Sequence, residues 1–93
     1  MDHPTLRQLE YLVAVAEHGT FGAAAEALHV SQPALSTQVA EAEQRLGMVV
    51  FERGRHGATA TPEGEAVITA ARRVLDEAKE LMRVAQERAG LRG

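Results

Sequence analysis

The sequence predicts a mainly α-helical fold in which three helices and a β-hairpin are followed by one long helix. Three observations predict it. Apolar residues recur at three- and four-residue spacing in several separate stretches. A segment between residues 49 and 61 instead has strand-forming residues around a glycine-rich turn. Aromatic residues make up only 3% of the chain and alanine is abundant, which suits closely packed helices.

The first two helices are recognised by their spacing and their ends. The spacing that predicts a helix over about 6–18 is that of Leu6, Leu9, Leu12, Val13 and Ala16. Gly19 ends this helix, and Thr20 can cap the next one by accepting a hydrogen bond from a free backbone N–H group. The second helix, over 21–28, is short and rich in alanine, so another helix can approach it closely.

The third helix has one apolar side and one uncharged polar side. A tight connection at residues 29–30 leads to Ser31 as the cap, Pro33 lies in the first turn, and Gly47 closes the helix. Its apolar side carries Leu35, Val39, Ala42 and Leu46, and its other side carries Gln32, Pro33, Ser36, Thr37 and Ala40. A face that is merely solvated is normally charged, so an uncharged, hydrogen-bonding face indicates a binding surface.

Between Met48 and Thr61 the apolar residues no longer follow the helical spacing. Residues 49–53 read as a strand, 54–57 as a turn and 58–61 as a return strand. Thr61 and Pro62 form a helix start, and nothing breaks the chain before Gly90, so one helix of about 42 Å is expected over 62–89.

The long helix carries an apolar stripe at heptad spacing. The stripe consists of Val67, Ala71, Val74, Ala78, Leu81 and Ala85. Its first turns can pack on the same domain, whereas about four later turns have nothing left to cover them. We therefore expect a partner helix, most simply that of a second copy in a homodimer. The alternative is that the whole stripe packs within its own domain.

This order of elements is that of a winged helix-turn-helix at 1–61, followed by a dimerisation helix at 62–89 and a tail at 90–93. The second helix of such a motif braces the third, whose first turns can enter a DNA major groove. Candidate base-reading residues are Gln32, Pro33, Ser36 and Thr37, because amides and hydroxyls pair with base edges and Pro33 can contact a thymine methyl group.

The remaining candidate contacts surround that helix. Candidates for the DNA backbone are Thr20, Ser31 and Gln38, and those of the wing are Arg53, Arg55 and His56. Each of these features also has a purely structural explanation, which stays open at this point. The polar face could lack charge by chance, the two arginines could keep a strand edge soluble, and Thr20 could be an ordinary helix cap.

The charge balance limits the kind of binding. The net charge is −3, and residues 1–61 contain four arginines and seven acidic residues. Nonspecific binding to nucleic acid is almost wholly electrostatic, so an architectural protein is disfavoured. We expect the acids Glu10, Glu17, Glu26, Glu41 and Glu43 to lie away from the polar face and the wing. The chain has no cysteine, no visible secretory signal and no apolar run that could span a membrane, which is compatible with the cytoplasm.

Residues 6–65 and the long helix resemble the N-terminal DNA-binding region of LysR-type transcriptional regulators. The resemblance rests on Ala24, Ala25, Leu28 and the block VSQPALS at 30–36, on Leu46, Gly47 and the block FER at 51–53, and on Thr61, Glu63 and Gly64. It implies a dimer formed through the long helix, double-stranded DNA with an interrupted inverted repeat as the target, and base or backbone contacts from Gln32, Pro33, Ser36, Thr37, Arg53 and Arg55. It also implies a small-molecule effector bound only by a C-terminal domain that these 93 residues do not include.

The chain departs from the family pattern in the third helix. Many members have a basic residue where this chain has Thr37. Members often carry further basic residues in the middle of the third helix, where this chain has Ala40, Glu41 and Ala42. The slope of the logarithm of the binding constant against the logarithm of salt concentration is therefore expected to be smaller in magnitude by about 0.9 for each missing phosphate contact.

Other functions fit the sequence less well. The four histidines have no ligand spacing, so neither an enzyme nor a metal or other cofactor is expected. The serious alternative is an interaction module whose long helix binds a partner and whose turn motif has lost its DNA function.

Overall fold

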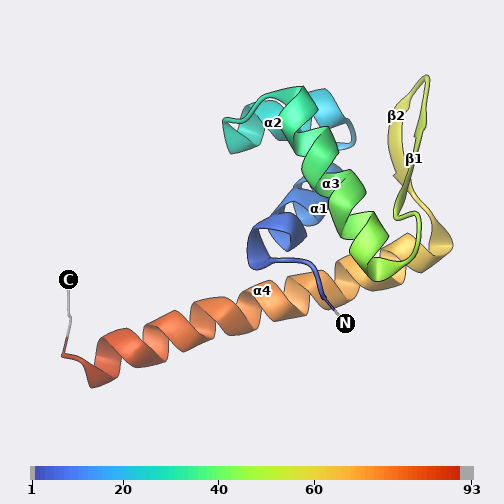
Figure 1. Cartoon of the computed structure of the whole chain (residues 1–93). Coiled ribbons are helices and arrows are strands. Elements are labelled where there is room, and N and C mark those ends of the chain that lie inside the picture. Colours follow the sequence, from blue (N-terminus) through green and yellow to red (C-terminus); the bar gives the residue numbers. More distant parts are fainter. Residues whose placement is uncertain (1, 91–93) are drawn as a thin grey trace.

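The computed structural model describes residues 2–90 and has the predicted mainly helical architecture (Figure 1). Its elements are α1 Leu6–His18, α2 Phe21–Leu28, α3 Gln32–Leu46, β1 Phe51–Gly54, β2 Gly57–Ala60 and α4 Pro62–Arg88. The two strands pair antiparallel and form the wing beside α3. The predicted winged helix-turn-helix with a long C-terminal helix is therefore confirmed.

Each helix begins at a side chain that caps it. Thr5, Thr20, Ser31 and Thr61 each accept a hydrogen bond from a backbone N–H of the first turn. These bonds satisfy donors that have no partner within the helix, which is why a short polar residue fixes each start so clearly in the sequence.

The core surrounds α1, which contacts α2, α3, α4 and β2. Leu12 and Val15 of α1 are fully buried, as are Leu35 of α3 and Val50 before the wing. Aliphatic side chains and alanines supply most of this core, as the composition predicts, and the three aromatic residues of the chain, Tyr11, Phe21 and Phe51, are buried in it as well.

The wing differs from its predicted bounds. The predicted strand at 49–53 begins two residues later, because the backbone of Val50 is bonded elsewhere. Its N–H donates to the Glu43 carboxylate at 2.7 Å, and its carbonyl accepts from the N–H of Thr61 at 2.9 Å. The return strand ends one residue early because Thr61 caps α4. Pairing of Gly54 with Gly57 narrows the turn to Arg55 and His56.

Helix α4 extends well past the rest of the domain. Its 27 residues span about 40 Å, and Figure 1 shows its second half running away from the other elements. It ends at Arg88, one residue before the predicted end, with Ala89 as its C-cap. The predicted tail lies outside the described residues from position 91 onward. No helix in the described range is long and apolar enough to cross a membrane.

The first turn of α4 touches the backbone before the wing, and this contact requires a glycine. A Cβ added at Gly64 would overlap the carbonyl oxygen of Val50 and lie 2.9 Å from Oγ1 of Thr61. We expect Gly64→Ala to destabilise the fold by about 1–3 kcal/mol through overpacking, despite the better helix propensity of alanine. Thermal unfolding followed by circular dichroism would measure this. Gly54→Ala is the matched control, since its Cβ would meet no atom within 4 Å; equal stability of the two variants would contradict the prediction.

Candidate nucleic-acid interface

The exposed side of α3 is the uncharged face that the sequence predicts. Gln32, Pro33 and Thr37 are exposed and Ser36 is half-buried. The opposite side of the helix holds Leu35, Val39 and Ala42, all buried in the core. Burial of one side therefore fixes which side chains α3 presents outward.

Two capped helix starts border this face. Oγ of Ser31 accepts from the N–H of Ala34 at 3.2 Å, and Oγ1 of Thr20 accepts from the N–H of Ala23 at 3.0 Å. The Gln32 amide lies over the start of α2, since a Cβ at Gly22 would stand 3.4 Å from its Oε1. Gln32 therefore lies where α2 and α3 meet.

The hydroxyls of the face make defined internal bonds. Oγ1 of Thr37 donates to the carbonyl oxygen of Pro33 at 3.0 Å. Oγ of Ser36 accepts from Nη2 of Arg53 at 2.6 Å. The structure thus brings the predicted wing residue Arg53 directly to a predicted reading residue.

Arg53 is held by an aromatic pair. Its guanidinium carbon lies 3.5 Å from the centre of the Phe21 ring, a cation–π arrangement. Phe21 meets Phe51 edge-on, with ring centres 6.2 Å apart. Arg53 is nevertheless an exposed residue, as are Arg55 and His56 in the turn of the wing. What distinguishes Arg53 is its contact with Phe21 and Ser36.

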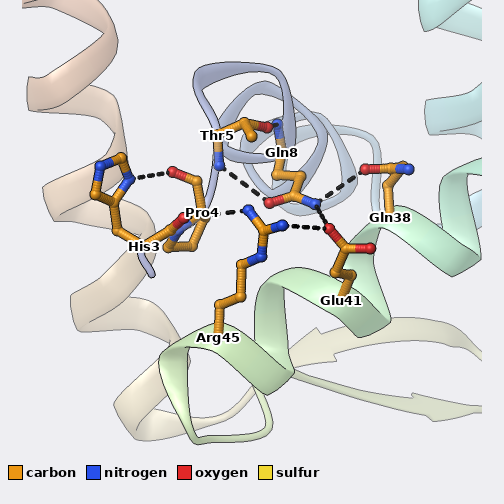
Figure 2. A network of polar contacts seen from close by, with 7 residues as sticks. All are labelled: His3, Pro4, Thr5, Gln8, Gln38, Glu41 and Arg45. Atoms are coloured by element: carbon orange, nitrogen blue, oxygen red, sulfur yellow. Dashed lines mark hydrogen bonds and ion pairs between the residues drawn. The ribbon is translucent and has the colours of Figure 1, made fainter. Parts of the chain in front are cut away.

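Gln38 is turned toward α1 rather than along the exposed face. Figure 2 shows its Oε1 accepting from Nε2 of Gln8 at 3.0 Å, while the same nitrogen donates to Oε2 of Glu41 at 2.8 Å. Arg45 pairs with that carboxylate oxygen at 2.9 Å and donates to the carbonyl oxygen of His3 at 3.3 Å. This network joins α3 to the start of α1.

Gln8 and Phe21 support the site, and neither role was predicted from the sequence. Gln8 is only 1% exposed, and its Oε1 also accepts from the N–H of Thr5, forming a capping box. The pattern Thr5-x-x-Gln8 was a visible signal for that box. Nothing local indicated that Phe21 would meet an arginine from the wing.

Several acidic residues make polar contacts that join one element of the fold to another. Glu43 accepts from the N–H groups of Val50 and Phe51, and Glu17 pairs with Arg72 of α4 at 2.7 Å. On α4, hydrogen bonds and charge from Arg83 lower the pKa of the Glu80 carboxyl. Both side chains lie on the exposed surface of α4, so the pair contributes little to stability.

The apolar stripe of α4 divides into two parts. Val67 packs against the core and Ala71 is only 3% exposed, so these two residues already have partners within the chain. Beyond them, Leu81 is 66% and Met82 57% exposed, and Val74 and Ala85 are exposed as well. A mainly apolar groove lies beside this part, between α4 and the helices α1 and α2. Its lining includes Leu6, Val13, Leu28, Leu75, Ala78 and Met82, and also the polar residues Glu10, Glu17, His18 and Lys79.

No group of three or more histidine or acidic residues that could hold a metal ion occurs within residues 2–90. What the described arrangement offers is hydrogen-bonding chemistry: hydroxyls and an amide on α3, two helix N-termini and a basic wing.

Comparison with known proteins gives consistent matches. The family model described as "Bacterial regulatory helix-turn-helix protein, lysR family" matches residues 6–65. The chain is 50% identical over 70 residues to the HTH-type transcriptional regulator TfdS of Cupriavidus pinatubonensis, which covers 75% of this chain and 24% of that protein. It spans about a quarter of the length of the regulators that it matches.

Two solved structures with bound DNA are also similar to the chain. The CbnR_DBD–DNA complex matches with a TM-score of 0.83 and 42% identity, covering 95% of this chain and 99% of that one. The complex of BenM_DBD with benA site 1 DNA matches with a TM-score of 0.87 and 34% identity, over the same shares of the two chains.

The Gln8 network gives a test of how α3 is held. Gln8→Glu keeps the shape of the side chain but replaces the donating amide by a carboxylate that faces the oxygens of Gln38 and Glu41. We expect a loss of about 1–3 kcal/mol in the free energy of unfolding, because buried acceptors would oppose each other. Urea denaturation at neutral pH would measure it. The control is Gln86→Glu on the exposed side of α4; a similar loss there would show that added charge alone is responsible.

Proposed function

The chain belongs to the lysR family of bacterial helix-turn-helix regulators, and from this premise we propose that it binds double-stranded DNA sequence-specifically, as a dimer on an interrupted inverted repeat. As a DNA-binding domain of a transcriptional regulator it is not an enzyme. We place small-molecule sensing in the part of such regulators that this chain does not match.

The observation that carries the proposal is the uncharged face of α3. Amide and hydroxyl groups pair with base edges over short distances, and the absence of acids removes repulsion from phosphates. Gln32 can bond adenine through two hydrogen bonds, while the capped starts of α2 and α3 suit phosphate groups. Arg55 in the exposed turn suits the DNA backbone or a narrow minor groove.

The solved neighbours support the same assignment. Both are DNA complexes of DNA-binding domains, and both match this chain over nearly its whole length. We infer that α3 enters the major groove and that the wing lies over the flanking backbone.

The proposal of a dimer rests on the outer half of α4. Leu81 and Met82 expose apolar side chains on this part of the helix, beside the groove between α4 and the helices α1 and α2. Within the described residues, no other element covers them. A second copy of α4 laid along this surface would bury the stripe and place the two reading helices apart. Half-sites separated by about one helical turn or a multiple of it then follow.

Selection of bound duplexes from a random pool, at low and moderate salt, tests the proposed function. An enriched inverted repeat that survives moderate salt would support it. A folded, dimeric protein that enriches no sequence would favour the interaction module, in which α4 binds a partner and α3 reads nothing.

Gln32→Ala should weaken binding to the selected site by about 1–3 kcal/mol and relax base choice at one position of each half-site, because it removes a pair of hydrogen bonds. Fluorescence anisotropy on the selected and a scrambled duplex would measure this. Gln44→Ala, at the exposed far end of α3, is the control and should change neither affinity. An equal loss on both duplexes would argue against base reading by Gln32.

Leu81→Glu should convert the dimer into a monomer, because it places a charge on the apolar stripe where the partner helix would pack. Sedimentation equilibrium would give the mass directly. Gln86→Glu adds the same charge to exposed α4 and should leave the dimer intact. An unchanged mass of the Leu81 variant would remove α4 from the interface.

A further inference from the structure

We propose that Arg53 positions Ser36, and that the two neighbouring hydroxyls of the reading face are thereby set to opposite hydrogen-bond directions: Ser36 donates to DNA, and Thr37 accepts from it. This inference rests on the proposed function. It assigns to each residue the class of base edge that it can read.

The direction at Ser36 follows from the chemistry of its partner. A guanidinium group has N–H donors and no acceptor, so in the 2.6 Å contact the Ser36 oxygen must accept. The single hydroxyl hydrogen of Ser36 remains free to point outward. A donor from DNA would have to approach an oxygen that already faces a positive charge, so this position favours acceptors on the DNA.

The geometry of Arg53 favours this direction. Its guanidinium is stacked on Phe21, which is itself buried and packed against Phe51. The side chain therefore has a platform on one side and Ser36 at its tip. Arg53 acts on base reading through Ser36, as a positioning residue.

The direction at Thr37 follows in the same way. A carbonyl oxygen can only accept, so in the 3.0 Å contact with Pro33 the Thr37 hydroxyl must donate its single hydrogen. The lone pairs of the exposed oxygen are left for DNA. In this orientation the Thr37 hydroxyl has no hydrogen left for a phosphate oxygen, which favours a contact with a base over a contact with the DNA backbone.

The two residues therefore select different base edges. In the major groove, acceptors are N7 and O6 of guanine, N7 of adenine and O4 of thymine, whereas donors are the amino groups of cytosine and adenine. We assign acceptor edges to Ser36, and cytosine or adenine to Thr37. Because the two side chains are about 100° apart around the helix, they face different base positions.

Random-duplex selection with matched variants tests the inference. Thr37→Val keeps the shape of the side chain and removes the acceptor. It should reduce affinity for the selected site roughly 3- to 10-fold and abolish one cytosine or adenine preference. Ser36→Ala should erase a preference at a different position. Arg53→Gln should relax that same position, and combining it with Ser36→Ala should relax it no further.

Arg55→Gln is the control, because Arg55 lies in the exposed turn; it should lower affinity without altering preference at the Ser36 position. Where that position is an adenine, whose one major-groove acceptor is N7, replacing it by 7-deazaadenine should weaken binding of the original protein and leave binding of Ser36→Ala unaffected. Circular dichroism melting of each variant checks that it is folded.

The outcomes separate the two levels of the argument. If the original protein enriches no site, the proposed function fails and this inference fails with it. If it enriches a site but Thr37 governs a guanine or thymine, or Arg53→Gln weakens all sequences equally, the function stands and the assignment of directions is wrong.

Discussion

The packing of α3 on α1 is the contact on which the rest of the structure depends. Leu35 and Val39 bury one side of α3, and the Gln8 amide bonds across to the same helix. Apolar burial supplies most of the free energy, whereas the amide network fixes rotation and height because its bonds are directional. With one side of α3 held this way, its other side can only face outward, and α2 and the wing then flank it.

A DNA-binding domain with an acidic balance needs its charges to be well separated, and this fold separates several of them. The carboxylate of Glu43 accepts hydrogen bonds from backbone N–H groups at the start of the wing. Glu41 accepts a hydrogen bond from Gln8 and forms an ion pair with Arg45. Glu17 forms an ion pair with Arg72. These contacts join α3 to α1 and to the segment before the wing, and join α1 to α4. Net charge is therefore a poor guide to the potential at one face of a small domain.

Local chemistry made most of the fold predictable, because caps and glycine ends act within a single turn. Thr20, Ser31 and Thr61 each fixed a helix start from the sequence alone. The start of β1 was misplaced because a carboxylate seven residues earlier binds the N–H of Val50.

Contacts between distant segments were likewise invisible in the sequence. Gln38 was expected at the DNA backbone, yet its amide oxygen meets Gln8, 30 residues earlier. Arg53 was predicted as a DNA contact of the wing, and no local signal indicated that it would reach Ser36, 17 residues away. The assignment of individual DNA contacts stays a prediction. In the outer half of α4 the stripe was predictable because heptad spacing depends only on helix geometry.

The division of α3 into a buried side and an exposed side has an evolutionary consequence. Gln32, Pro33 and Thr37 contribute little to the core, so they can be exchanged with small effects on folding. Under the proposed function, a lineage of such domains can therefore acquire new operators by surface substitution while its scaffold persists. Ser36 is under a different constraint, because any replacement also changes what Arg53 meets. Drift at that position should be slow and coupled to the wing, leaving one part of the recognition code older than the rest.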